Sequence, residues 1–296
     1  MSDLSGGRLF LVDAFTSVPM TGNPAAVLLL AGPPSDELCR RIGEELNKPA
    51  TAVAWPAGEP GRFGLRWFTA ASELTLCGHG TLAAARVLAG AGLGVDGVLR
   101  FDTVAGPLSA TAGPDLVELT FPGLPPRPVG DAALTAAVRG VLGVPDGAPV
   151  EVLRNDLDLL AVLPGEHDVR AARPDLAALH ELDTRGLIIT AAGDGPDADF
   201  VSRFFAPAVG IPEDAVTGSA HCALAPLWIE RLGRQPLLGR QVSARGGTVR
   251  VGLAGDRVRL GGAVVVLSEG TWLGGTAPAA VPAGSEPADG QHPDDG

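Results

Sequence analysis

The chain has 296 residues, which suits one large domain or two domains of about 100–150 residues each. Hydrophobic residues make up 46% of it, and no apolar run reaches the roughly 18 residues of a membrane helix, so we expect a globular protein and no membrane partner. The net charge is −12 and no basic stripe is present, which argues against nucleic acid as a partner.

The N-terminal segment has neither a basic region nor an apolar stretch before a cleavage site, so we expect a cytoplasmic protein. Its three cysteines, Cys39, Cys77 and Cys222, have no CxxC or Cys/His spacing. This pattern argues against a disulfide framework and against a metal site.

Apolar segments between turn signals predict a strand-rich α+β chain. The expected strands are 8–15, 25–30, 51–55, 64–68, 98–102, 116–121, 150–153, 159–163, 187–190, 200–205, 241–243, 248–253, 257–260 and 263–267. The expected helices are 36–46, 80–91, 132–141, 175–181 and 219–232. Ser35 is placed to cap the first helix, where Leu38, Ile42 and Leu46 share one face.

A proline-rich segment at 121–130 has the composition of a linker and divides the chain into unequal parts. We therefore predict an N-terminal half over 1–122 and a C-terminal half over 131–275. The remaining residues, 276–296, contain too little apolar surface to pack and are predicted to be disordered.

A GxGxxG pattern at Gly92, Gly94 and Gly97 follows a predicted helix and precedes a strand. Dinucleotide-binding motifs have the opposite order, so this pattern does not indicate a cofactor site. No P-loop, nucleophile elbow or HExxH motif is present.

Three other segments carry groups suited to chemistry. The sequence VDAF at 12–15 leads into GNPA at 22–25, which by itself reads as a hairpin. The second segment, LTLCGHGT at 74–81, delivers Cys77 and His79 to a glycine turn that opens a helix of small residues, although a single histidine there is often structural. The third runs from FFAP at 204–207 to EDAVTGSAHC at 213–222, where an acidic turn that caps a helix is the simpler interpretation.

The second and third segments both end at a predicted helix N-terminus. Exposed N–H groups at such a terminus attract carboxylates, and the dipole of the helix lowers the pKa of an adjacent thiol or imidazole. Anion binding and proton chemistry can therefore share these turns.

Read together and in order, the three segments resemble the PhzF-like family of phenazine biosynthesis, and the match extends from Val12 to about Leu267. The resemblance implies the diaminopimelate-epimerase fold, in which two pseudo-symmetric β-barrel-like halves each wrap around a central helix. It also implies an active site in the cleft between the halves, no cofactor, and a homodimer, which relatives often form.

The chain departs from these relatives at two positions. In diaminopimelate epimerase a cysteine from each half forms the pair of bases. Here the first position matches Cys77, whereas the second falls at Ala215, which disfavours a two-thiol racemase. In PhzF-like isomerases a glutamate after the first helix is regarded as the base, and Ala50 occupies that position.

The resemblance carries His79, Asp214 and Ser219 over as pocket residues. Asp214 is the first choice for the missing base, because a carboxylate in a dry cleft near a histidine can exchange a proton. The Cys77 thiolate and Glu73 are alternatives, while Glu44 and Glu45 are expected to face solvent. Substrate binding is assigned to the remaining residues of the three segments: Asn23, Gly78, Gly80, Thr81, Thr217, Gly218, Ser219 and Ala220.

We therefore predict a cofactor-independent isomerase that moves a proton, and with it a double bond, on a small amino- or hydroxy-acid-derived substrate. Loss of the glutamate is consistent with a specialised pathway such as antibiotic biosynthesis. The alternatives are an epimerase or a dehydratase of the same fold, and a catalytically silent homologue that only binds a small acid or a partner protein.

Overall fold

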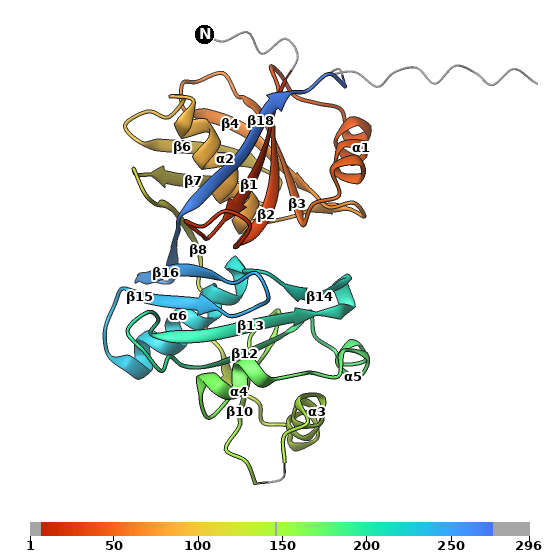
Figure 1. The fold of residues 1–296 in the computed structure, drawn as a ribbon, viewed down its shortest axis with the longest axis vertical. Helices are drawn as coiled ribbons and strands as arrows, with labels where there is room; N and C mark the ends of the chain where they lie inside the picture. The colour runs from red at the N-terminus through yellow and green to blue at the C-terminus, as the bar shows by residue number, and fades with distance from the viewer. Residues whose placement is uncertain (1–6, 146, 275–296) are drawn as a thin grey trace, which may run out of the picture.

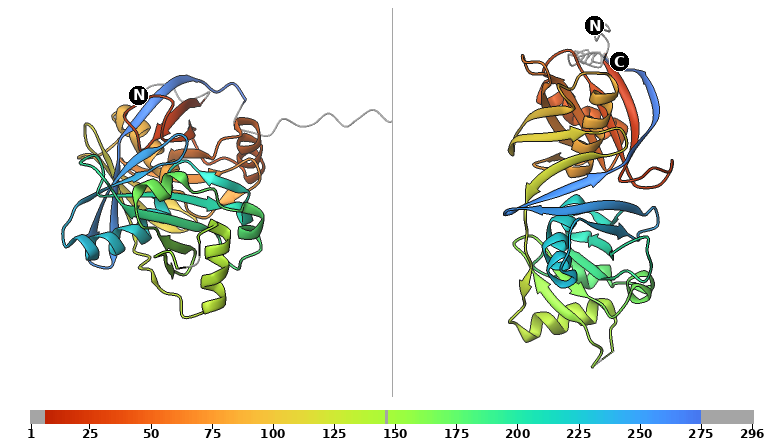
Figure 2. Two further views of the ribbon diagram at one scale, coloured as in Figure 1. Left: turned by 60° about the horizontal axis from the view of Figure 1, so that its bottom comes forward. Right: turned by 90° about the vertical axis from the view of Figure 1, so that its left-hand side faces the viewer.

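The computed structural model describes residues 7–145 and 147–274, and within them the chain forms two lobes, one above the other in Figure 1. The predicted tail at 276–296 lies outside the described residues. One long helix lies inside each lobe, α2 in the first and α6 in the second (Figure 1). The view from the side shows the two lobes stacked end to end (Figure 2).

The first lobe is formed mainly by the elements up to residue 122. They are β1 (Arg8–Ala14), β2 (Asn23–Leu29), α1 (Asp36–Leu46), β3 (Ala50–Pro56), β4 (Arg62–Phe68), β5 (Glu73–Leu74), α2 (Gly78–Gly90), β6 (Val98–Thr103), β7 (Gly106–Ala112) and β8 (Val117–Pro122).

The second lobe follows, and the last strand returns to the first lobe. These elements are β9 (Arg127–Pro128), α3 (Ala132–Leu142), β10 (Glu151–Arg154), β11 (Leu159–Val162), α4 (Glu166–Ala171), α5 (Leu176–His180), β12 (Leu187–Ala192), β13 (Phe200–Ala206), the 3₁₀ turn η1 (Pro207–Val209), β14 (Ile211–Asp214), α6 (Gly218–Leu232), β15 (Leu237–Gln241), β16 (Gly247–Ala254), β17 (Arg257–Gly262) and β18 (Val264–Thr271).

The two lobes repeat one pattern of strand pairing. In the first lobe β2 and β3 are parallel, β3 and β4 antiparallel, β4 and β6 parallel, and β6, β7 and β8 antiparallel. In the second lobe β11, β12, β13, β15, β16 and β17 pair in the same succession. Strands β8 and β17 pair with each other at the junction. The predicted pseudo-symmetric α+β fold is confirmed by this repeat.

The chain crosses between the lobes twice, which changes the predicted boundaries. Strand β9 follows β8 but pairs with β10, while β18 follows β17 but pairs along its whole length with β1. The prediction that the C-terminal half runs from 131 to 275 is therefore wrong for β18, which lies in the first lobe (Figure 1). The crossing ties the lobes together through backbone hydrogen bonds.

Most predicted elements are present with small shifts at their ends. Helix α1 has the predicted bounds, since the Ser35 hydroxyl accepts from the Leu38 N–H and Asn47 ends the helix in the left-handed conformation. Sequence reasoning missed β7 and α4, and it placed β15 too late, at 241–243. Strand β15 begins directly after Pro236 and alternates buried residues at 237, 239 and 241, a pattern that Gly239 hides in the sequence.

Helices α2 and α6 are rich in small residues because strands surround them. Helix α2 packs against β1, β2, β3, β7 and β8, and α6 packs against β15, β16 and β17. Helix α2 approaches the sheet most clearly at Gly80, where a Cβ would lie 2.7 Å from Cδ1 of the fully buried Trp67 ring. This close approach places the first turn of α2 directly against the sheet.

We predict that Gly80→Ala destabilises the fold by about 1–3 kcal/mol, because a buried indole ring has little room to move. Gly90→Ala is the matched control in the same helix, since a Cβ at Gly90 meets nothing within 4 Å. It should be neutral or stabilising by up to about 1 kcal/mol. Urea unfolding of both variants tests this, and equal stabilities would contradict the packing described here.

Candidate active site

The N-termini of α2 and α6 meet head to head between the lobes. A Cβ built on Gly78 would lie 3.7 Å from the Cα of Gly218, and the N-cap residues are Cys77 and Thr217. Apart from the hydrogen bond from the Gly80 backbone to Cys77, neither N-cap side chain bonds to its own helix. The other N–H groups of both first turns are therefore free and converge on one place. Two positive helix ends this close favour an anion between them.

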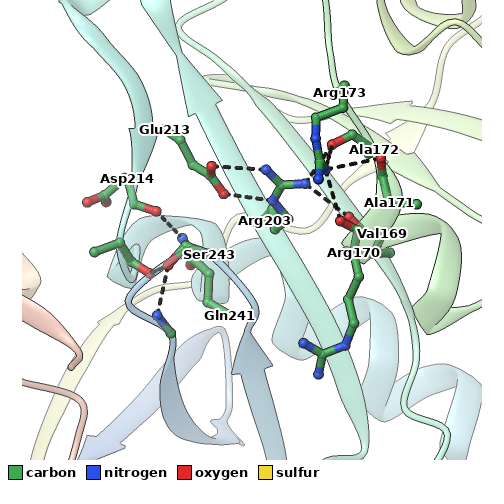
Figure 3. A network of polar contacts seen from close by, with 12 residues as sticks. Val169, Arg170, Ala171, Ala172, Arg173, Arg203, Glu213, Asp214, Gln241 and Ser243 are labelled. Atoms are coloured by element: carbon green, nitrogen blue, oxygen red, sulfur yellow. Dashed lines mark hydrogen bonds and ion pairs between the residues drawn. The ribbon is translucent and has the colours of Figure 1, made fainter.

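Equivalent ion pairs in the two lobes position these helix starts. Arg66 on β4 binds both carboxylate oxygens of Glu73 at 2.7 Å. Arg203 on β13 binds both oxygens of Glu213 at 2.7 and 3.0 Å, and also donates to the Ala172 carbonyl (Figure 3). Each pair holds the short strand, β5 or β14, that leads into a central helix. Glu73 is therefore engaged on the scaffold, away from the role of a replacement base.

Asp214 follows Glu213 at the end of β14 and joins the two lobes. Its Oδ1 accepts a hydrogen bond from Nδ2 of Asn23 on β2 at 2.8 Å, and its Oδ2 accepts from the Thr217 hydroxyl at 2.6 Å. Gln241 fixes the turn by donating to the Asp214 carbonyl and accepting from the Thr217 N–H, both at 2.8 Å (Figure 3). The carboxylate is thus held in one orientation at the meeting point of the helices.

His79 lies in the first turn of α2. Its Nδ1 is 3.6 Å from Sγ of Cys77, and its Nε2 is buried with no partner among the described residues. Burial lowers the pKa of His79, and the nearby negative charge of Asp214 acts in the opposite direction. The imidazole is therefore neutral near pH 7, and one of its nitrogens has no partner among the described residues.

Cys77 is a thiol rather than a thiolate. Burial raises the pKa of its side chain to about 12, which outweighs a hydrogen bond from the Gly80 backbone. The sequence-based expectation that the helix terminus lowers this pKa is therefore wrong, because the sulfur is enclosed by the sheet. This difference favours Asp214 over Cys77 as the base.

The structure corrects the position that matches Cys77 in the second lobe. Both central helices begin with a glycine, and the residue before that glycine is Cys77 in α2 and Thr217 in α6. Thr217, rather than Ala215, is therefore the counterpart, although either residue leaves the site without a second thiol. Ala50 begins β3 and is fully buried in the core of the first lobe, and Glu44 and Glu45 are exposed on α1 as predicted.

The predicted binding residues have different amounts of free hydrogen-bonding capacity. Both donors of Thr81 go to the Cys77 carbonyl, so Thr81 closes the first turn of α2 instead of facing a ligand. Thr217 uses its N–H and hydroxyl on Gln241 and Asp214. Asn23 keeps a buried Oδ1 without a partner among the described residues. The free donors are the N–H groups of the first turns at Gly78, Gly218, Ser219 and Ala220, whereas the Gly80 N–H is used on the Cys77 sulfur.

Sequence reasoning missed Arg185 and Asp158. Arg185 donates from Nη2 to the Ser219 hydroxyl at 3.0 Å and from Nε to Asp158 at 2.8 Å, and its Nη2 also pairs with Asp158. Asp158 is buried, and burial raises the pKa of its carboxyl against the opposing effect of Arg185. These residues lie far apart in sequence and match no motif, so no local signal indicated their contact.

No group of three or more His, Cys, Asp and Glu side chains among the described residues is arranged to hold a metal ion. None of the helices in this part of the chain is long and apolar enough to cross a membrane. The predicted absence of a cofactor, the homodimer and the cytoplasmic location remain predictions.

The fold and site define a two-lobed protein with an epimerase-like fold, in which titratable side chains lie where two helix N-termini meet. The family model described as phenazine biosynthesis-like protein, PhzC-PhzF, matches residues 12–270. The chain belongs to this family, and it is an isomerase, as predicted.

Three known proteins show how far the similarity extends. A Pseudomonas aeruginosa protein named as an uncharacterized isomerase is 45% identical over 259 residues, covering 88% of this chain and 95% of that protein. The crystal structure of a PhzF family protein from Enterococcus faecalis has a TM-score of 0.82 at 36% identity and covers 90% and 98% of the two chains. A hydroxyproline epimerase from Agrobacterium vitis, solved with bound trans-4-hydroxy-L-proline, shares the fold with a TM-score of 0.56 at 12% identity, covering 91% and 93%.

The pH dependence of stability provides a test of the α6 helix start. His221 is fully buried and its Nδ1 lies 2.8 Å from the Thr217 carbonyl; burial lowers its pKa to about 4 from an ordinary 6.5. Above pH 6.5 neither state is protonated there, so the full stability is present. As the pH falls from 6.5 to 4, His221 is protonated in the unfolded chain but stays neutral in the folded chain. This difference lowers the free energy of unfolding by about 3 kcal/mol.

We predict that His221→Asn, which keeps a donor near the Thr217 carbonyl but does not titrate, loses less stability than the wild type between pH 7 and pH 4. The free energy of unfolding in urea, measured for both proteins across this range, checks the prediction. Parallel curves would show that His221 is not buried in its neutral form.

Proposed function

We propose that the chain catalyses a proton shift on a small carboxylic acid, using Asp214 and His79 as the two acid/base groups. The observation that carries the proposal is their placement: each comes from a different lobe, at the point where the N-termini of α2 and α6 meet, and the buried Nε2 of His79 has no protein partner among the described residues. A substrate seated there would satisfy that nitrogen.

The substrate carboxylate binds the free N–H groups of the two first turns, where the helix dipoles favour negative charge. Asp214 then removes a proton from the carbon next to that carboxylate. The enolate-like charge that develops is stabilised by the same N–H groups and by the Ser219 hydroxyl. No residue needs to form a covalent bond with the substrate.

His79 returns the proton at a second position. In the tautomer with the proton on Nδ1, that N–H donates to the sulfur of the Cys77 thiol and leaves the lone pair of Nε2 free. Nε2 then takes the proton from Asp214 and gives it to the second carbon of the substrate, so both side chains return to their starting states. A carboxylate that accepts and an imidazole that donates suit double-bond migration on an amino- or hydroxy-acid-derived substrate. The absence of a glutamate at Ala50 supports a substrate from a specialised pathway, such as antibiotic biosynthesis.

Asp214→Asn should reduce proton exchange at least about 10²-fold, because it removes the accepting carboxylate with little change of shape. The test follows loss of C–H signals by NMR when the protein is incubated in heavy water with a panel of small amino and hydroxy acids that includes trans-4-hydroxy-L-proline. Binding of butyrate serves as the control, since the anion site is unchanged in the variant. If Asp214→Asn exchanges protons at the wild-type rate, Asp214 is not the base.

A second candidate function, binding of a small acid without catalysis, is favoured by one observation: the buried side chain at the family's glutamate position is Ala50. Ala50→Glu separates the two. In an active enzyme the added carboxylate enters a core position and should lower exchange on the substrates of the wild type. If the wild type exchanges no acid that it binds and Ala50→Glu creates exchange, the chain is a binding protein.

A further inference from the structure

A cavity of about 470 Å³ opens in the second lobe beside the candidate active site. It is lined by the turn between β10 and β11, residues 154–159, and by residues 182–185, which lead into β12. Arg185 belongs to this lining and also donates to the Ser219 hydroxyl, so one side chain connects the cavity with the first turn of α6.

Asn155 gives this cavity an unsatisfied donor. Its side-chain Oδ1 accepts from the N–H groups of Leu157 and Asp158 at 2.8 and 2.9 Å, which fixes the orientation of the amide. The residue is only 3% exposed, and its Nδ2 is buried without a partner among the described residues. Buried amide N–H groups are nearly always bonded, so this one indicates a missing acceptor.

Arg185 supplies further donors. Its Nε and Nη2 are used on Asp158 and Ser219, while its Nη1 donates to no residue in the described part of the chain. The three acidic residues of the lining leave these donors open: Asp158 is bound to Nε and Nη2 of Arg185, Asp156 is paired with Arg127 at 3.0 Å, and Asp183 bonds to neither Asn155 nor Arg185. Two side chains of the lining, Asn155 and Arg185, therefore have N–H groups without an acceptor among the described residues.

We propose that this cavity is a second substrate subsite, which binds an oxygen acceptor that the substrate carries in addition to the carboxylate at the helix N-termini. The acceptor is a second carboxylate or a carboxamide oxygen, held by Asn155 Nδ2 and Arg185 Nη1. The subsite rests on the proposed function for its place in the reaction. It narrows the substrate class to small acids with two such groups.

Binding of simple acids tests the subsite without knowledge of the substrate. Succinate, glutarate and adipate offer two carboxylates at increasing spacing, butyrate offers one, and the monoamide of glutarate replaces one carboxylate by a carboxamide. We expect at least one two-acceptor acid to bind about tenfold more tightly than butyrate, measured by titration with NMR of the protein amides. Comparison of glutarate with its monoamide distinguishes a charged from a neutral acceptor.

Asn155→Asp is the matched variant, because it keeps the Oδ1 that caps the turn and removes only the N–H donors. It should lose the preference for two-acceptor acids while butyrate binding is retained. Asn47→Asp, at the exposed end of α1, adds the same charge elsewhere and should keep the preference. Arg185→Lys, which can still pair with Asp158, should weaken the preference as well.

Two results would overturn the subsite: equal affinity of all these acids for the wild type, or an unchanged preference in Asn155→Asp. These outcomes are separate from those of the proton-exchange experiment. Proton exchange without a preference for two-acceptor acids would reject the subsite but not the proposed reaction. A preference for two-acceptor acids without proton exchange would reject the proposed reaction but not the subsite.

Discussion

The structure depends on the close approach of two helix N-termini, α2 and α6, where a Cβ on Gly78 would lie only 3.7 Å from the Cα of Gly218. Two positive dipole ends repel each other when they meet, so the arrangement needs negative charge nearby. Asp214 supplies part of it from the end of β14, held by Asn23 and Thr217. A substrate carboxylate between the helices would supply the rest, which links the stability of the closed arrangement to ligand binding.

The titratable groups of the candidate site lie where the two lobes differ. The lobes share the clamp formed by Arg66–Glu73 and Arg203–Glu213 and the glycine that opens each central helix. The residue after the clamping glutamate is Leu74 in one lobe and Asp214 in the other, and the second residue of the helix is His79 or Ser219. Each lobe therefore contributes one titratable group, which suits a directed proton shift better than a symmetrical racemisation.

Sequence patterns were sufficient where chemistry is local. The Ser35 cap and the spacing of Leu38 and Ile42 predicted the bounds of α1. The glycine turns predicted that His79 lies in the first turn of one helix and that Asp214 lies shortly before the start of another. Sequence patterns were not sufficient where burial sets a pKa or where residues far apart in the sequence are in contact. The pKa of Cys77 is set by the sheet around it, and the Arg185–Ser219 contact joins residues 34 positions apart in sequence. The return of β18 to β1 spans almost the whole chain.

The two hydroxyls at the start of α6 have opposite roles because their partners differ. Arg185 can only donate, so the Ser219 oxygen accepts from it and its own hydrogen is directed to another acceptor. The Asp214 carboxylate can only accept, so the Thr217 hydrogen is used on it. In the proposed reaction, an anionic group would therefore be stabilised on the Ser219 side and a proton would be accepted on the Thr217 side. A bound acid would turn its carboxylate toward Ser219 and Arg185 and its reacting carbon toward Asp214, and any second acceptor it carries would then lie near Asn155.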